Sequence, residues 1–332
     1  MSARGGGLLK YMGKRAIDRA AVVISSLTLQ FLLLRVLPYY VLGIDPSFFF
    51  LNPNLTEEQK EIIRRQFGLD EPLLSQFVKY VLSLFTGQLG FSFYTRRPVY
   101  AELMERLPNT VLLLGTSTVL TIILGLIIGI IAVSKRGTRF DASVIGSSIF
   151  ISAFPLFYVG LLLLLVFGFY LKWFPIAGSI SRPPPRDPVR YVADLLWHMA
   201  LPLTALLVTS VGGFALFIRN LFLTQLGEDY VITARAKGLT EREVMLKHVL
   251  RNVLAPVITI LALEFPGIIS GAVITETVFS WYGVGRWLFD AATQFDYPVV
   301  QAVLFIQVVL TVISLYIADI VIALLDPRVR LR

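Results

Sequence analysis

The feature that most constrains this chain is a run of apolar residues from Thr110 to Val133 that contains no charged side chain. A helix of about 20 residues is enough to cross the hydrocarbon core of a bilayer, and this run is longer. The rest of the chain has the same character, because 56% of its residues are hydrophobic and only 16% are charged. The sequence therefore predicts an all-α membrane protein rather than a soluble domain.

Hydropathy predicts six transmembrane helices. They cover Ile17–Leu37, Thr110–Val133, Ala142–Leu171, His198–Ile218, Val253–Phe279 and Val299–Leu325. An even number of crossings places both termini on the same side of the membrane. Lys and Arg are more numerous in the tails and short connections of that side, so we expect both termini to be cytoplasmic in a multi-pass protein of the cell membrane. The first segment has no small-residue cleavage site, so we interpret it as an uncleaved span.

Several function classes are excluded by what the sequence does not contain. Without cysteine there is no disulfide framework, no thiolate metal site and no cysteine nucleophile. The net charge of +8 does not indicate a nucleic-acid partner, because Lys and Arg are scattered between apolar segments. The two histidines, His198 and His248, fall on opposite sides in the predicted topology and do not share a metal site. No phosphate-binding loop occurs, so we expect no ATP hydrolysis and no cofactor in this chain.

A long connection from Pro38 to Pro108 predicts a small helical extracytoplasmic insertion between the first and second spans. Its first helix starts with a capping box at Thr56 and ends at Gly68. A second helix starts near Pro72. Its apolar residues either pack on the first helix, which we favour, or lie on the membrane surface; they are Phe77, Val78, Val81, Leu82 and Phe85.

Proline and glycine give further expectations about the spans. Pro155 and Pro202 should kink or break their helices. The second outer loop, Lys172–Trp197, contains four prolines and should be irregular and extended. The glycine pair Gly212-Gly213 and the run from Gly125 to Gly129 favour close contacts between helices.

The connection between the fourth and fifth spans carries two helix signatures. A short helix of small residues ends at Gly238, and a second helix starts with Thr240 as its cap and Glu243 at its third position. Small side chains such as Ala234 and Ala236 allow close approach of a partner surface. These properties suit a rigid element that couples movements, but they also suit an ordinary solvated connection, and helix caps alone do not decide between the two.

The order of residues in this loop resembles a known family. Gly227 to Leu239 is similar to the coupling loop of permease subunits in the dipeptide and oligopeptide (peptide/nickel) family of ATP-binding-cassette importers. The resemblance covers nearly the whole chain. It continues through Phe67–Asp70, Lys135–Gly137, Arg251-Asn252, Thr275–Trp281, Gly283–Trp287, Asp296–Gln301 and Asp326–Arg328.

The resemblance implies a type I importer permease (MetI-like) fold. It also implies four kinds of partner besides the lipid bilayer: a second, homologous permease subunit, two ATP-binding-cassette ATPases that bind ATP and Mg, and an extracytoplasmic solute-binding protein. In that family a short helix of the loop docks in a groove of the ATPase. Here the docking residues would be Glu228, Asp229, Tyr230, Thr233, Ala234, Arg235, Ala236, Lys237 and Gly238.

The chain departs from the family pattern in three places. The wider importer motif has Glu-Ala-Ala where this chain has Ile232-Thr233-Ala234, a change that the dipeptide branch tolerates. Tyr39 to Leu42 interrupt a segment after the first span that is usually Pro-Gly-Asp-Pro, and Gln88 stands where Asp is common. The last two changes lie in the outer insertion and weaken any assignment of the solute.

With the resemblance, the chain divides into four regions. They are 1–37, the cytoplasmic N-tail and first span; 38–108, the extracytoplasmic insertion; 109–325, a five-helix permease core with the cytoplasmic coupling loop 219–252; and 326–332, a cytoplasmic C-tail.

Two residues are candidates for the translocation pathway, Glu264 and Gln301. A carboxylate in a span is costly unless it faces water or a partner. Glu264 therefore lines the pathway, pairs with another helix, or belongs to a span that is displaced enough to expose it. The solute remains open among dipeptides, oligopeptides, nickel chelates and oligosaccharides. A channel or secondary transporter would predict intramembrane charges coupled to ions or a pair of matching broken helices, and Glu264 alone is little support for it. An intramembrane enzyme would need a nucleophile and base that the spans do not supply.

Overall fold

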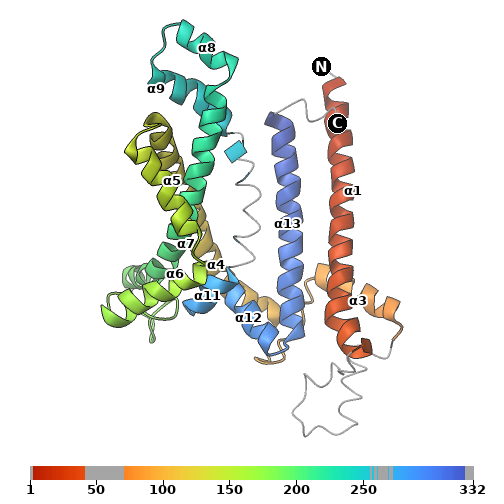
Figure 1. The fold of residues 1–332 in the computed structure, drawn as a ribbon. Helices are drawn as coiled ribbons and strands as arrows, with labels where there is room; N and C mark the ends of the chain where they lie inside the picture. Colours follow the sequence, from red (N-terminus) through yellow and green to blue (C-terminus); the bar gives the residue numbers. More distant parts are fainter. Residues whose placement is uncertain are drawn as a thin grey trace. The chain divides into compact units, whose positions relative to one another are not determined.

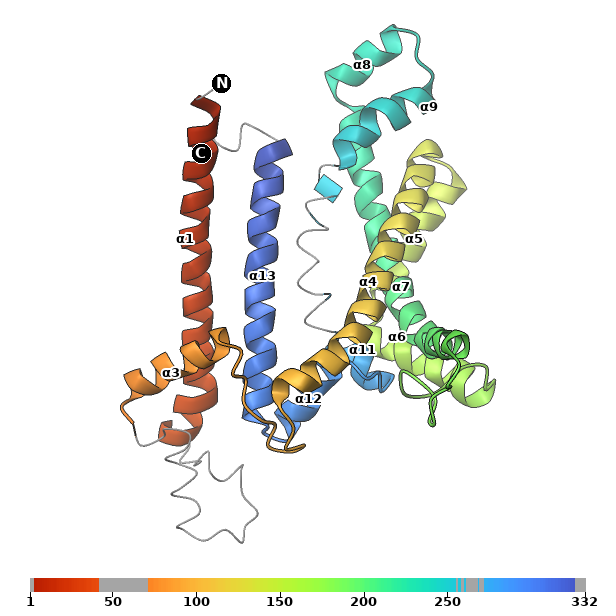
Figure 2. The ribbon, with the colours of Figure 1, turned by 180° about the vertical axis from the view of Figure 1, so that it is seen from behind.

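The structure, a computed structural model, describes residues 3–41, 71–254, 256–257, 260, 268 and 272–325. The regular elements of this part are helices, shown in Figures 1 and 2, and an isolated β-bridge joins Phe91 and Pro98. The helices in chain order are α1 (Ala3–Phe31), the π-helical η1 (Leu32–Val41), α3 (Leu73–Phe85), α4 (Val99–Ser134), α5 (Arg139–Ser152), α6 (Leu156–Leu163), the π-helical η3 (Leu164–Tyr170), α7 (Pro188–Leu226), α8 (Asp229–Ala236), α9 (Glu241–Glu243), the π-helical η4 (Val244–Val249), α11 (Val273–Val278), α12 (Val284–Thr293) and α13 (Tyr297–Leu325).

Four of the described helices are long and apolar enough to cross a membrane, namely Met12–Leu37, Val99–Ser134, Pro188–Leu226 and Tyr297–Ile317. The number rises to five if α5 and the continuous helix α6–η3 form one bent span. An all-helical membrane protein is therefore confirmed. The predicted span Val253–Phe279 falls mostly on residues outside the described part, and so do the predicted helix after Thr56 and the candidate Glu264.

The predicted third span is broken near its middle. The helices Arg139–Ser152 and Leu156–Tyr170 meet at an angle of 93°. Pro155 stands at the N-cap of the second helix, where its missing N–H and fixed φ are compatible with a helix start but not with a helix interior. The expected disruption at Pro155 is thus confirmed, whereas α7 continues without a break through Pro202.

Two helices begin earlier than predicted. The second outer loop is not irregular up to Trp197, because α7 already begins at Pro188. Asp187 caps this helix by accepting a hydrogen bond from the backbone N–H of Arg190 at 2.8 Å, and proline suits the first helical turn. Helix α4 likewise begins at Val99, within the segment predicted as insertion, and runs on into the second span.

The chain forms two compact units. In the first unit, which contains the chain up to Pro108 and from Trp287 to Ala323, α1 and α13 lie side by side and antiparallel, and α3 crosses α1 at one end (Figures 1 and 2). The core of this end consists of Leu27, Phe31, Tyr80, Leu84 and Phe305. At the other end Asp319 of α13 accepts a hydrogen bond from Arg19 Nη2 of α1 at 2.8 Å, so this carboxylate is paired between two helices.

In the second unit, Asn109 to Arg286, α7 packs against α4 and α5 through glycines. A Cβ added to Gly129 would lie 2.7 Å from the side chain of Ile218, and one on Gly212 would lie 2.9 Å from Ser148 Oγ. Because real Cβ atoms do not come this close, the helices meet where only glycine fits. The prediction that these glycines serve close helix contacts is confirmed, except at Gly213, where a Cβ would meet open space.

Candidate functional site

The candidate site is the loop between α7 and η4, and its first element is the eight-residue helix α8. Asp229 lies in its first turn and Arg235 in its last turn, so both charges oppose the helix macrodipole. Gly238 follows with a φ of +81°, a left-handed conformation that glycine adopts at little cost and that stops the helix. The predicted end of the helix at Gly238 is therefore confirmed.

The second helical element is fixed by the predicted capping box. Thr240 Oγ1 accepts a hydrogen bond from the backbone N–H of Glu243 at 3.3 Å, and Glu243 Oε2 accepts one from the backbone N–H of Thr240 at 3.2 Å. Lys247 Nζ donates to Glu243 Oε1 at 3.0 Å. The hydrogen bonds from Lys247 and Thr240 favour the ionised carboxylate and lower the pKa of Glu243 to about 2.

An exposed ion pair ties the two elements together across the turn. Arg235 Nε and Nη2 donate to the two carboxylate oxygens of Glu241 at 2.7 Å and 3.1 Å. This bidentate contact raises the pKa of Arg235 and lowers the pKa of Glu241. Since both side chains are exposed, the pair orients the turn more than it stabilises the fold.

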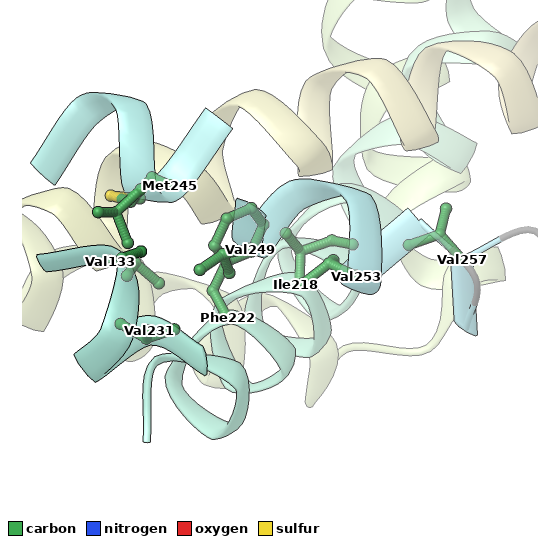
Figure 3. Close-up of a cluster of buried hydrophobic side chains, with 10 residues drawn as sticks. Val133, Ile218, Phe222, Val231, Met245, Val249, Val253 and Val257 are labelled. Atoms are coloured by element: carbon green, nitrogen blue, oxygen red, sulfur yellow. The ribbon is translucent and has the colours of Figure 1, made fainter. Parts of the chain in front are cut away.

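The loop is anchored by a cluster of buried apolar side chains, shown in Figure 3. We call it the base cluster. It consists of Val133 from α4, Ile218 and Phe222 from α7, Val231 and Ala234 from α8, Val244, Met245 and Val249 from η4, and the following Val253 and Val257. Because α8 shares one core with one end of each of the long helices α4 and α7, a force on α8 is transmitted to those helices through packed side chains rather than through a flexible linker.

Helix α8 has one face toward the base cluster and one toward solvent. Val231 is 0% exposed and Ala234 is 4% exposed, so Ala234 is small because it packs inside the chain, and not because a partner approaches it as expected. Tyr230 is half-buried and its hydroxyl donates to Gln225 Oε1 at 2.9 Å. The other predicted docking residues are exposed: Glu228, Asp229, Thr233, Arg235, Ala236, Lys237 and Gly238.

Ile232 lies in the middle of the exposed face with 62% of its surface accessible, and the sequence prediction did not select it. Together with Asp229, Thr233 and Ala236 it forms a stripe with helical spacing, which we call the outer stripe. A signal was present in the sequence, because Val231 and Ile232 are adjacent and a helix cannot turn both to the same side. Ile232 is the large apolar side chain of this stripe, and it is therefore the apolar contact that the stripe offers to a partner surface.

A second feature missed by the sequence prediction is the ion pair between Asp141 of α5 and Arg219 of α7. Arg219 Nε lies 2.6 Å from Asp141 Oδ1, and Nη2 lies 2.9 Å from Oδ2. The backbone N–H of Gly137 donates to the same carboxylate at 3.1 Å. The pair is largely buried, with side-chain exposures of 14% and 5%, and Arg219 directly follows Ile218 of the base cluster. It therefore joins the α4–α5 connection to the helix that carries α8.

A third feature is a polar network around Glu276 in α11, which is fully buried. Its carboxylate accepts hydrogen bonds from Thr110 Oγ1 at 2.8 Å and from the backbone N–H of Arg286 at 3.0 Å, while Thr110 Oγ1 accepts one from the N–H of Val284 at 2.8 Å. The two side chains thus accept hydrogen bonds from backbone N–H groups at the N-terminus of α12, which have no partner within the helix. Gly283 has no Cβ because one there would overlap the Glu276 carboxylate. The network joins two segments of the family resemblance, Thr275–Trp281 and Gly283–Trp287.

The candidate pathway residues are not brought together by the structure as described. Gln301 is half-buried in α13 of the first unit, and Glu264 lies outside the described residues. Among the residues the structure describes, no group of three His, Cys, Asp or Glu side chains is arranged to hold a metal ion.

Comparison with known proteins gives matches over almost the whole chain. Residues 121–331 match the family described as binding-protein-dependent transport system inner membrane component, and residues 8–114 match the N-terminal family of such membrane components. The oligopeptide transport system permease protein AppB of Bacillus subtilis is 33% identical over 96% of this chain and 98% of its own length. The glutathione transport system permease protein GsiC of Escherichia coli K12 is 34% identical, covering 97% and 99%. The di/tripeptide transport system permease protein DppB of Pseudomonas aeruginosa is 35% identical, covering 91% and 93%.

Proposed function

Because this chain belongs to the family of inner membrane components of binding-protein-dependent transport systems, we propose that it is the permease subunit of an ATP-driven importer for peptides. The observation that supports the solute class most directly is the agreement among relatives, whose names specify oligopeptides, di- and tripeptides and glutathione, a tripeptide. The protein is not itself an enzyme in this function, since ATP and Mg are bound by separate ATPase subunits.

The outer stripe of α8 is the proposed docking surface for one cytoplasmic ATPase. It combines an exposed apolar anchor, Ile232, with small and polar neighbours, and the base cluster holds its helix firmly against α4 and α7. When the ATPase pair closes on ATP, α8 moves with it. The base cluster and the Asp141–Arg219 pair pass this movement to α4, α5 and α7, which changes the access of the pathway between the two membrane faces.

The remaining assignments follow from the same function. The permease pairs with a homologous permease, two ATPases and an extracytoplasmic solute-binding protein. We assign six spans, with both termini and the loop 219–252 in the cytoplasm, an outer insertion over 38–108, a core over 109–325 and tails at the two ends. The four or five spans among the described residues are compatible with six, because the predicted span Val253–Phe279 lies mostly beyond them. Glu264 and Gln301 remain the proposed pathway residues.

The decisive experiment is uptake of labelled di- and tripeptides into vesicles that contain the purified permease pair, its ATPases and its binding protein. Uptake should require ATP inside the compartment that holds the ATPases and should stop when the ATPases cannot hydrolyse it. Uptake by vesicles that contain this chain alone would refute the proposal in favour of a channel or secondary transporter. An active complex that ignores peptides but imports oligosaccharides or nickel chelates would refute only the solute class.

A further inference from the structure

Helix α3 has three different faces, which is one more than a helix needs to pack on a protein surface. One sector faces the core of the first unit and contains Gln76, Phe77, Tyr80 and Leu84. A second sector is polar and contains Ser75, Lys79, Ser83 and Thr86. A third sector is apolar and exposed, and contains Leu74, Val78, Leu82 and Phe85, with 48–75% of each residue accessible. At 100° per residue each sector forms a continuous stripe along the helix.

The core-facing sector fixes where α3 lies relative to the spans. Phe77 and Tyr80 contact the ring of Phe31 in α1, with centroid separations of 5.3 Å and 5.7 Å, and Tyr80 donates a hydrogen bond to Gln30 Oε1 at 3.2 Å. At the other end of the helix, Phe85 of the exposed sector also touches Phe305 of α13, with 5.2 Å between ring centroids, while 59% of Phe85 stays accessible. Figure 2 shows that α3 lies across α1, rather than parallel to it, and ends beside α13.

These contacts occur near the ends of two membrane spans. Phe31 lies six residues, about 9 Å of helical rise, inside the Leu37 end of its span, and Phe305 lies eight residues, about 12 Å, inside the Tyr297 end of its span. An amphipathic helix at a membrane interface buries its apolar face about 5–10 Å into the boundary between headgroups and acyl chains. The contact with α1 falls within this range and the contact with α13 lies about 2 Å deeper, so both place α3 close to the interfacial depth.

The neighbouring first span also exposes apolar side chains beside α3. The α1 and η1 residues Leu29, Leu32 and Leu33 are 45–56% exposed at the same level, as expected of side chains that face lipid. A helix packed on such a surface and surrounded by water would leave its own apolar stripe unburied. A helix at the interface instead places that stripe in acyl chains and its polar stripe among headgroups.

We propose that α3 is an interfacial helix that binds the lipid bilayer through Leu74, Val78, Leu82 and Phe85, at the Leu37 end of the first span. The polar sector then faces headgroups and water, and Lys79, which forms an ion pair with Glu71, is placed to meet anionic lipid headgroups. The bilayer rather than a neighbouring protein segment covers the apolar sector, contrary to the packing arrangement favoured from the sequence. This inference requires a membrane protein but is independent of the transported solute.

The natural absence of cysteine makes a direct test simple, because single cysteines can be introduced and spin-labelled without removing others. The full chain, with Leu74, Val78 or Leu82 changed to Cys in one set and Ser75, Lys79 or Ser83 in the other, is reconstituted in vesicles of phosphatidylethanolamine and phosphatidylglycerol. Oxygen, which partitions into acyl chains, and a water-soluble nickel chelate then compete to relax each label. We expect an oxygen-to-nickel accessibility ratio several-fold higher at the apolar positions than at the polar ones.

Two results would overturn the proposal. Apolar positions protected from both reagents would mean that protein covers them, and apolar positions reached mainly by nickel would mean that they face water. Tryptophan variants give a second readout that does not depend on a spin label. Brominated acyl chains should quench Val78→Trp more strongly than Ser83→Trp, above the background of the four native tryptophans, and equal quenching would likewise contradict an interfacial helix.

Discussion

The adjacent residues Val231 and Ile232 test whether one face of α8 anchors the helix and the opposite face docks the ATPase. Val231 is 0% exposed in the base cluster, and Ile232 is 62% exposed on the outer stripe. Both are β-branched aliphatic residues on the same short helix, so replacing either with alanine has a similar effect on helix propensity. The two substitutions therefore differ mainly in which surface they alter.

The magnitudes follow from the surface that each residue buries. Ile232→Ala removes three carbons, about 2.4 kcal/mol if fully buried at about 0.8 kcal/mol for each. Since 62% of the residue is available to a partner, about 1.5 kcal/mol of docking free energy should be lost, or about tenfold in Kd. Val231→Ala removes two buried carbons and leaves a cavity, which lowers the free energy of unfolding by about 1.6 kcal/mol or more.

The assay is a titration of the purified ATPase onto the permease complex in nanodiscs, combined with thermal unfolding of the same samples. Ile232→Ala should weaken ATPase binding without changing the unfolding temperature. Val231→Ala should lower the unfolding temperature and change the Kd less. If Ile232→Ala leaves the Kd within twofold of the natural chain, the outer stripe is not the docking surface. If Val231→Ala leaves stability unchanged, the base cluster does not anchor the helix.

Three further predictions concern packing, ionisation and the buried ion pair. Gly212→Ala should destabilise the protein by about 1–3 kcal/mol in denaturant unfolding because its Cβ meets α5, whereas the control Gly213→Ala should be neutral or stabilising by up to about 1 kcal/mol; equal effects would contradict the close contact. Because the folded pKa of Glu243 is about 2, below its ordinary 4.5, its contribution to loop stability is present above pH 4.5 and is lost as the pH falls toward 2. The carboxyl carbon chemical shift of Glu243 should therefore titrate near pH 2, and a midpoint near 4.5 would refute the capping geometry. Asp141→Asn should lower the free energy of unfolding by about 3 kcal/mol and reduce peptide uptake more than ATPase binding. The double variant with Arg219→Gln should lose less stability than the sum of the two single variants. Additive losses would mean that the two side chains do not act as a pair.

The features that could be predicted from the sequence are those set by neighbouring residues. Thr240 and Glu243 are three positions apart, so their capping box needs nothing from the rest of the fold. Gly238 ends α8 through its own backbone freedom, and Pro155 breaks its span through its own ring. The length of an apolar segment likewise predicts a span without reference to any other.

The features that could not be predicted depend on residues far apart in the chain. Asp141 and Arg219 are separated by 78 positions, and Thr110 and Glu276 by 166. Nothing local indicates that these side chains meet. The sequence also did not show whether the side chain of Ala234 faces a partner or the core of the chain, because a small residue suits both. The positions of α7 and η4 place it in the core. The early start of α7 was different, since Asp187 and Pro188 carry a local helix signal that the proline-rich context outweighed.

The missing Cβ of Gly283 also limits how this protein can evolve. Since any side chain at Gly283 would overlap the Glu276 carboxylate, the carboxylate must move and give up its hydrogen bonds to Thr110 and Arg286 when Gly283 changes first. Losing or shortening Glu276 first removes the overlap, so the order in which the two positions change decides how much each step costs. A library that randomises Gly283 alone should strongly favour glycine, while one built on Glu276→Ala should admit small residues there.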